Sequence, residues 1–109
     1  MTTAAAKSYT TLSEDRTAPE HIVLHEDEHS RMIYYVIQPG EQTGWHTHEL
    51  DYTVIRVSKG TLTSHFADGT STDFNYEPGT TSSYKAPFEH NAINTGDTPI
   101  IGYEIEFKN

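Results

Sequence analysis

Short runs of aromatic and β-branched residues, each closed by a turn signal, recur along the chain. The strongest run spans residues 31–38 (RMIYYVIQ) and stops at Pro39-Gly40. Similar runs span residues 51–57, which precede Lys59-Gly60, and residues 100–107 near the end of the chain. Aromatic and β-branched residues favour strands, whereas Pro and Gly interrupt them. We therefore predict strands over these three segments.

Shorter segments complete the pattern. They are bounded by Gly, Pro, Asn or Asp and span residues 21–25, 61–66, 71–76, 80–85 and 91–94. No stretch of 12 or more residues repeats with the period of an α-helix. Eight or nine short strands with regular turn signals are typical of a β-sandwich or barrel. An all-β jelly roll and a lipocalin-like barrel both fit this pattern.

The chain of 109 residues has the length of one small domain. Residues 1–18 are rich in Thr, Ala and Ser and show no periodicity, and Pro19 ends this stretch. We expect a flexible N-terminal arm over residues 1–18 and a single β-barrel domain over residues 19–109. Residues 1–11 contain no apolar stretch of signal-peptide length, so we expect a cytoplasmic protein.

Composition excludes several function classes. Seven Lys and Arg against 16 Asp and Glu give a formal net charge of −9, whereas binding to a nucleic-acid backbone needs clustered basic residues. The absence of cysteine excludes disulfides, zinc–thiolate sites, iron–sulfur clusters and thiol catalysis. No apolar run approaches the length of a membrane span. We therefore expect a small molecule as partner, and neither nucleic acid nor membrane.

Two of the seven histidines, His46 and His48, form a His-Thr-His motif. Alternate residues of a strand face the same side with Cβ atoms about 6 to 7 Å apart, so both imidazoles can bind one divalent metal. The pair also fits two ordinary surface or core histidines, and its spacing alone does not separate these interpretations. The residues around the motif carry the more specific signal.

Further residues stand at set distances from the histidine pair; they are Gly40, Gly60, Gly79, His90 and Asn94. With the pair, they resemble the two motifs of the cupin superfamily, G(X)5HXH(X)3-4E(X)6G and G(X)5PXG(X)2H(X)3N. The chain looks most like the short single-domain bacterial cupins often described as β-alanine-degradation type. The resemblance implies a double-stranded β-helix (jelly-roll) fold and one divalent transition metal bound by His46, His48 and His90.

The chain departs from the family pattern at three positions. Thr53 stands where the first motif has glutamate, and Lys85 and Pro87 stand where the second has proline and glycine. Threonine is a poor ligand for a divalent ion. We expect a metal held by three histidines with water in the remaining positions. Asp51, on the same face of the strand as Thr53, is an alternative fourth ligand, and loss of the metal is the third interpretation.

Three neutral imidazoles leave the charge of a divalent ion almost uncompensated, which favours anionic substrates, hydroxide or dioxygen-derived ligands. We therefore expect a metalloenzyme acting on a small polar metabolite. Among the possible reactions we rank Fe(II)-dependent dioxygenation first and isomerase, decarboxylase or lyase chemistry second. Mn, Ni, Cu, Co and Zn also fit a site without thiolate. A non-catalytic module that binds a small ligand or a metal is the hypothesis from a different class.

Strand alternation suggests which residues line the pocket. We expect Thr53 to point inward and Arg56 to point away, so Arg56 is not used as a clamp for a substrate carboxylate. Tyr34, Gln38 and Tyr103 are polar members of neighbouring strands, and they can orient a substrate or act as acid or base.

The remaining histidines and the size of the core complete the expectations. His21, His25 and His29 lie around three acidic residues, and we expect a solvated acidic edge there. We expect His65 to be an ordinary histidine. A modest core with an open cavity is marginal on its own, and cupins of this length commonly pair, so we expect a homodimer.

Overall fold

Strands are the only regular elements in the part of the chain that the structure describes, residues 20–108 of a computed structural model. They are β1 (Glu20–Glu26), β2 (Ser30–Ile37), β3 (His46–His48), β4 (Tyr52–Arg56), β5 (Gly60–His65), β6 (Ser71–Tyr76), β7 (Thr81–Tyr84), β8 (Phe88–Asn94) and β9 (Ile100–Phe107). The arm predicted over residues 1–18 lies outside the described residues. Among the residues described, none forms a helix that could cross a membrane.

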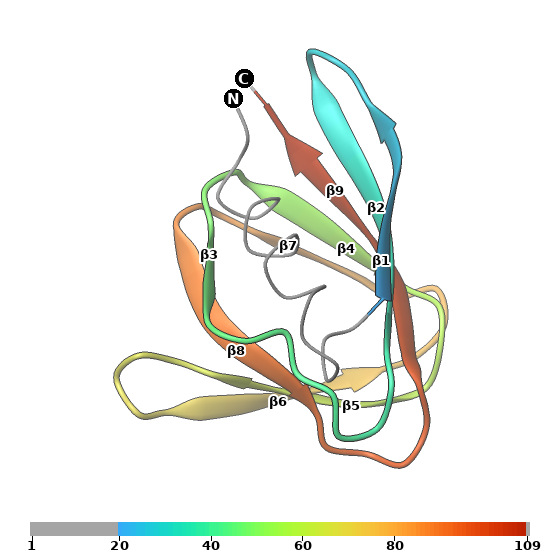
Figure 1. The fold of residues 1–109 in the computed structure, drawn as a ribbon, viewed down its shortest axis with the longest axis vertical. Helices are drawn as coiled ribbons and strands as arrows, with labels where there is room; N and C mark the ends of the chain where they lie inside the picture. Colours follow the sequence, from blue (N-terminus) through green and yellow to red (C-terminus); the bar gives the residue numbers. More distant parts are fainter. Residues whose placement is uncertain (1–19, 109) are drawn as a thin grey trace.

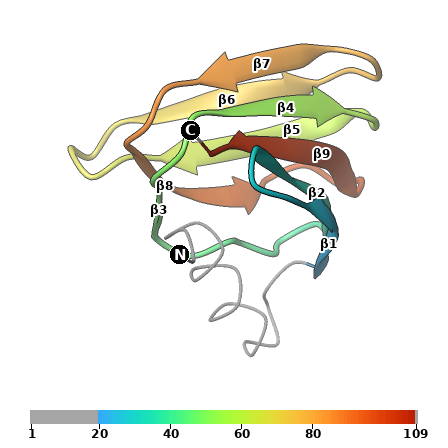
Figure 2. The ribbon, with the colours of Figure 1, turned by 90° about the horizontal axis from the view of Figure 1, so that it is seen from above.

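Two antiparallel sheets face one another (Figure 1; Figure 2, seen from above). The first sheet has the strand order β1-β2-β9-β4-β7, and the second has the order β3-β8-β5-β6. Strands that are distant in sequence lie side by side, since β2 pairs with β9 and β3 with β8. Two packed sheets with such crossovers form a jelly roll rather than an up-and-down barrel. The all-β jelly-roll prediction is confirmed.

The first sheet does not follow the usual rule of apolar inside and polar outside. The outer face of β2 and β9 carries half-buried apolar or aromatic side chains: Met32, Tyr34, Val36, Ile101, Tyr103 and Ile105. The buried positions of these strands include the charged residues Arg31, Glu104 and Glu106. In β4 the buried positions are Tyr52, Val54 and Arg56. The predictions that Thr53 points inward and Arg56 outward are therefore wrong, because apolar side chains on the outer face hide the true direction of alternation.

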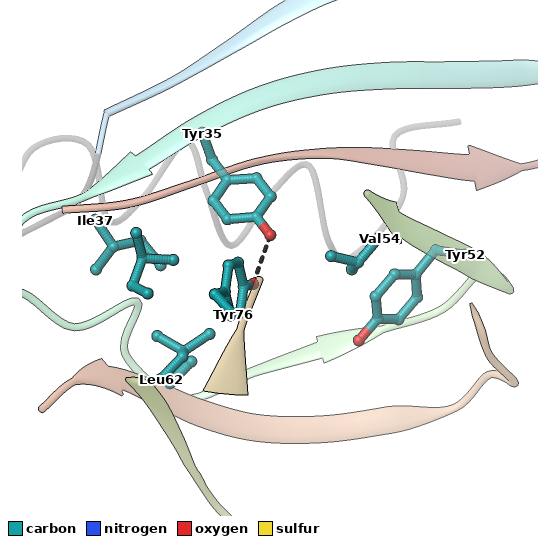
Figure 3. Close-up of a cluster of buried hydrophobic side chains, with 8 residues drawn as sticks. Tyr35, Ile37, Tyr52, Val54, Leu62 and Tyr76 are labelled. Atoms are coloured by element: carbon teal, nitrogen blue, oxygen red, sulfur yellow. Dashed lines mark hydrogen bonds between the residues drawn. The ribbon is translucent and has the colours of Figure 1, made fainter. Parts of the chain in front are cut away.

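An apolar cluster lies between the two sheets (Figure 3). Its members are Tyr35, Ile37, Tyr52, Val54, Leu62, Tyr76, Ala92 and Ile100. The hydroxyl groups of Tyr35 and Tyr76 form a buried hydrogen bond of 2.7 Å across it. Gly102 makes room for this pair, since a Cβ at Gly102 would lie 2.5 Å from the Tyr35 hydroxyl oxygen.

Asn94, the last residue of the predicted motifs, fixes the end of β8. Its side chain is 1% exposed and donates hydrogen bonds of 2.8 Å to the carbonyls of Ile37 and Thr98. Its side-chain oxygen accepts a hydrogen bond from the backbone N–H of Gly96. Asn94 therefore ties β8 to β2 and to the loop before β9, and so holds the strand that carries His90.

Candidate metal centre

Three buried histidines from two neighbouring strands meet in the interior. His46 and His48 lie on β3, and His90 lies on β8, directly opposite His46 in the strand register. Alternation along β3 sends His46 and His48 to the same inner face, with Thr47 between them pointing the other way. The three residues are 4%, 1% and 9% exposed. The structure thus brings together all three histidines predicted from the motifs.

Their Nε2 atoms converge. The Nε2 atoms of His46 and His48 are 3.0 Å apart, and those of His48 and His90 are 3.3 Å apart. Two nitrogen ligands that each lie about 2.1 Å from one ion are about 3.0 Å apart at a right angle and about 3.4 Å apart at a tetrahedral angle. The observed separations match the edges of a coordination shell, so the donor set fits a divalent transition metal.

The Nδ1 atoms of two of these rings face fixed oxygen atoms. His46 Nδ1 lies 2.8 Å from the carbonyl oxygen of Gly44, to which it donates. His90 Nδ1 lies 2.9 Å from the hydroxyl of Ser64, a side chain that is 1% exposed. A hydrogen bond at Nδ1 fixes the ring orientation and leaves the Nε2 lone pair available to a metal.

The third ring has a carboxylate behind it. His48 Nδ1 lies 3.6 Å from Glu104 Oε2, and Glu104 is 3% exposed. Glu106, the next inward residue of β9, is fully buried and contacts Arg31 at 3.1 Å. Burial raises the pKa of Glu106, and the Arg31 charge opposes that shift. Ligand atoms of His48, Glu104 and Glu106 also lie within 4.8 Å of one another, so these residues form a second group that could hold an ion.

Sequence reasoning missed both glutamates. Glu104 and Glu106 alternate with Tyr103, Ile105 and Phe107, and such a pattern normally indicates polar residues facing solvent. The feature that identifies Glu106 as buried is its direct pairing with Arg31 between β2 and β9. Recognising it required the strand register, which the sequence does not state.

Burial keeps the three histidines neutral. Desolvation lowers the pKa of His46 below its usual value and lowers that of His90 to about 3. The pKa of His48 is held well below its usual value by desolvation and then by the two neighbouring imidazoles. Neutral imidazole is the form that binds metals. The site is therefore ready to bind an ion at neutral pH without first releasing protons.

Tyr52, one residue before Thr53, stands beside the histidines, and the three-residue spacing that the first motif also allows places its glutamate here. Its ring stacks on His48 with a centroid distance of 4.2 Å and an interplanar angle of 25°. Burial raises the pKa of Tyr52 strongly, so its phenol stays neutral and is a poor ligand. Thr53, assigned to this position by spacing, points outward, and its hydroxyl lies 2.8 Å from that of Ser83.

Asp51 is held elsewhere. Its carboxylate accepts a hydrogen bond of 2.8 Å from the backbone N–H of Ala86 and contacts Lys85 Nζ at 3.4 Å. These contacts lower the pKa of Asp51, the backbone hydrogen bond most. Its side chain is 47% exposed. The structure does not bring Asp51 to the converging Nε2 atoms.

The residues predicted to act as acid, base or substrate contacts lie away from the cluster. Tyr34 and Tyr103 pack against each other on the outer face of the first sheet, with ring centroids 5.4 Å apart. Gln38 follows the end of β2 and is exposed. None of the three is among the described residues that line the interior cavity. The structure does not bring them together with the histidines.

The three histidines of the predicted acidic edge differ in exposure. His25 and His29 are exposed beside Asp27 and Glu28, as expected of a solvated acidic edge. His21 differs from that expectation, because it is half-buried and lines the interior cavity. Burial is the main reason why the pKa of His21 is lowered.

A cavity between the sheets opens onto the histidine cluster. His48, His90, Ser64 and Glu104 line it at this end. Much of the remaining wall is aromatic: Tyr35, Tyr52, Phe74, Tyr76, Tyr84 and Phe88. Its empty volume is about 620 Å³, which includes space open to solvent at the mouth. The site therefore combines an ion-binding corner with a chamber whose wall is largely aromatic.

Comparison with known proteins agrees with this geometry. A family model described as a cupin domain matches residues 33–106, a span that contains the three histidines and both buried glutamates. No curated protein matches the chain.

Solved structures share the fold. A cupin domain from Bordetella pertussis Tohama I is 30% identical with a TM-score of 0.79, and the match covers 84% of this chain and 95% of that one. A conserved protein with a double-stranded β-helix domain from Klebsiella pneumoniae is 23% identical with a TM-score of 0.72, covering 86% of this chain and 80% of that one. The polyketide cyclase RemF from Streptomyces resistomycificus is 14% identical with a TM-score of 0.67, covering 84% and 66%. The last two likenesses concern the fold alone.

Proposed function

The chain belongs to the cupin domain family, and from this premise we propose that it is a metal-dependent enzyme acting on a small molecule in its interior cavity. The convergence of the Nε2 atoms of His46, His48 and His90 carries the proposal. These atoms lie at the separations expected of ligands to one ion, and His48 and His90 line the cavity that would hold the substrate.

The roles of the chain follow from the contacts of each ring. A divalent transition metal, when bound, supplies Lewis acidity and open positions for substrate, water or dioxygen. His46, His48 and His90 would hold it through Nε2. Ser64 fixes the ring of His90, and the Glu104 carboxylate lies 3.6 Å from Nδ1 of His48. The aromatic wall limits the access of water to this corner, which strengthens electrostatic interactions there.

Among the reactions open to such a site, we favour Fe(II)-dependent dioxygenation, with isomerase, decarboxylase or lyase chemistry next. Three neutral ligands leave several positions of the ion unfilled by protein and nearly all of its charge uncompensated. This supports binding of a chelating or anionic substrate together with a second small ligand. Dioxygen consumption that depends on both Fe(II) and an added small molecule tests the first choice. Iron-loaded protein that never consumes dioxygen with any substrate contradicts it.

Elemental analysis of untagged protein tests the site itself. We expect about one transition metal per chain, and a loss of at least ten-fold in the double variant His46→Ala/His48→Ala. His65→Ala is the matched control, because His65 lies on β5 outside the converging group and should leave the metal content unchanged. Equal metal content in all three proteins would contradict the proposal.

A binding module without turnover is the second candidate function. The observation that favours it is the lack of the motif's glutamate ligand, since Thr53 points outward and Tyr52 stacks on His48. A ligand that raises the melting temperature without forming a product would support this alternative. Turnover of any substrate at the metal would exclude it.

We also propose that the protein is a homodimer. Three consecutive residues of the edge strand β1, Ile22, Val23 and Leu24, are 46%, 45% and 51% exposed. An exposed apolar edge strand favours pairing with another chain.

A further inference from the structure

Arg56 is a buried cation in the wall of the cavity. It is 7% exposed, lies at the end of β4 and lines the same chamber as His48 and His90. No other Arg or Lys is among the described residues that line this chamber. An arginine stays protonated in proteins, and a buried charge is costly unless it is paired.

The partners of Arg56 are neutral. Its guanidinium donates to the hydroxyl of Ser82 at 2.7 Å and lies 3.5 Å from that of Thr80, both supplied by or next to β7. It also sits 5.1 Å from the ring centroid of Tyr76. Its Nε atom is buried and has no hydrogen-bond partner in the described structure. None of the ion pairs among residues 20–108 includes Arg56.

The second buried arginine shows the contrast. Arg31 is 5% exposed, and its Nε lies 3.1 Å from the carboxylate of Glu106. The same fold therefore pairs one buried guanidinium with a carboxylate and leaves the other facing hydroxyls, a ring and the cavity. The hydroxyl groups orient the guanidinium of Arg56 but do not neutralise its charge, so an anion remains the best partner for it.

Arg56 and the histidines lie at separate places along the chamber. Tyr52, which stacks on His48, precedes Arg56 by two inward positions of β4, or about 13 Å along the strand. Tyr76 and Tyr35 lie at the Arg56 end, where their hydroxyls are hydrogen-bonded (Figure 3). Glu104 lies opposite Val54, between the two ends. Much of the wall between the two ends is aromatic or aliphatic, so a single carboxylate on an apolar body suits the lining.

We propose that Arg56 binds the carboxylate of a small aromatic or aliphatic monocarboxylic acid, whose body packs on the aromatic wall and points towards the three histidines. This assignment names the substrate class of the metal site and in that sense rests on the proposed function. The binding itself needs no metal, so the two proposals can be tested apart.

The experiment compares benzoate with benzamide, which has nearly the same shape without the charge. Each probe is titrated into metal-free full-length protein and followed by protein NMR. We expect benzoate to bind at least ten-fold more tightly than benzamide and to show proximity to the Tyr76 ring. Arg56→Gln should weaken benzoate at least ten-fold, whereas Lys59→Gln removes a charge in the loop before β5 and should change nothing.

Two further variants keep the test decisive if Arg56→Gln fails to fold. Arg56→Lys retains the charge but loses the paired N–H donors of the guanidinium, and Ser82→Ala removes a hydroxyl that orients the guanidinium. Each substitution should weaken benzoate binding at least three-fold. Equal binding of benzoate and benzamide, no binding of benzoate, or full binding by the folded Arg56 variants would overturn the proposal. The unmodified protein separates the two proposals: no benzoate binding together with a normal metal load fails only this inference, whereas benzoate binding by a protein that takes up no metal at the three histidines fails only the metal proposal.

Discussion

At the scale of single residues, the site is defined by what lies behind each imidazole. Gly44, Ser64 and Glu104 face the Nδ1 atoms of His46, His90 and His48 respectively. These contacts point all three Nε2 atoms at one place. Groups that orient a metal ligand are about as important as the ligand, since their loss typically costs 10- to 100-fold in metal affinity.

Ser64→Ala tests this role. The substitution removes the hydroxyl partner of His90 Nδ1 inside the barrel, so we expect metal affinity to fall about 10-fold or more. The measurement is competition with a chelator of known affinity. Ser83→Ala is the control, because that hydroxyl pairs with Thr53 on the exposed side. Unchanged affinity in Ser64→Ala would mean that the ring is held by packing alone.

The lowered pKa values of the histidines predict a pH dependence of stability. An unfolded histidine takes up a proton near pH 6.5, whereas burial lowers the pKa of folded His90 to about 3. The unfolded state therefore binds more protons between these values, and the free energy of unfolding falls as the pH falls. For His90 the loss between pH 7 and pH 5 is about 2 kcal/mol.

Urea unfolding of the metal-free protein at pH 7, 6 and 5 measures this loss. The raised pKa of Glu106 acts in the opposite direction, so the comparison with His90→Gln isolates the histidine contribution. The variant should lose less stability on acidification than the original protein. Identical pH profiles would contradict neutral burial of His90.

Prediction of individual residues succeeded where the motif spacing was specific. It failed where the result depended on which face of a strand a side chain occupies. The motif spacings identified His46, His48 and His90, which the structure brings together. Tyr52, Arg56 and Glu104 were missed because spacing does not tell which side of a strand a residue faces. The motif spacing placed the glutamate position at Thr53, but the alternation of β4 turns Thr53 outward.

At the scale of elements, the strands were predictable and their faces were not. Runs of β-branched and aromatic residues ended by Pro and Gly located β2, β4 and β9 closely. The inner faces of these strands include charged residues, namely Arg31, Arg56, Glu104 and Glu106, whereas the outer faces of β2 and β9 carry apolar and aromatic ones. Pairing between β2 and β9, which are distant in sequence, decides which face is which.

Gly102→Ala tests the packing where these strands meet. A Cβ at this position would lie 2.5 Å from the Tyr35 hydroxyl and 2.9 Å from the carbonyl oxygen of Ile55. We expect destabilisation of about 1–3 kcal/mol from overpacking. Gly96→Ala is the matched control, since its Cβ would meet its nearest atom at 3.4 Å. Urea midpoints of the two variants give the comparison, and equal midpoints would contradict the close contact.

At the scale of the whole molecule, the acidic chain encloses a chamber with a different electrostatic character. The net charge of −9 argues against a polyanionic partner. Inside, Arg56 and the metal proposed on the three neutral histidines would favour a small anion. The fold class followed from the number of strands and their turn signals, whereas the chamber emerged only from the packing of two sheets.

The dimer is a prediction at this scale. Sedimentation equilibrium should give about twice the chain mass of 12.3 kDa. Replacing Ile22 and Leu24 of β1 by Lys should increase the monomer fraction, because a charged edge resists pairing. A mass near that of one chain at all concentrations would contradict the dimer.

The most direct test of the central claim is a crystal structure of the metal-loaded protein with anomalous diffraction data. We expect one anomalous peak bounded by the Nε2 atoms of His46, His48 and His90, about 2.1 Å from each. A peak bound instead by His48 Nδ1, Glu104 and Glu106, or no peak at the three histidines after loading, would contradict the proposed metal centre.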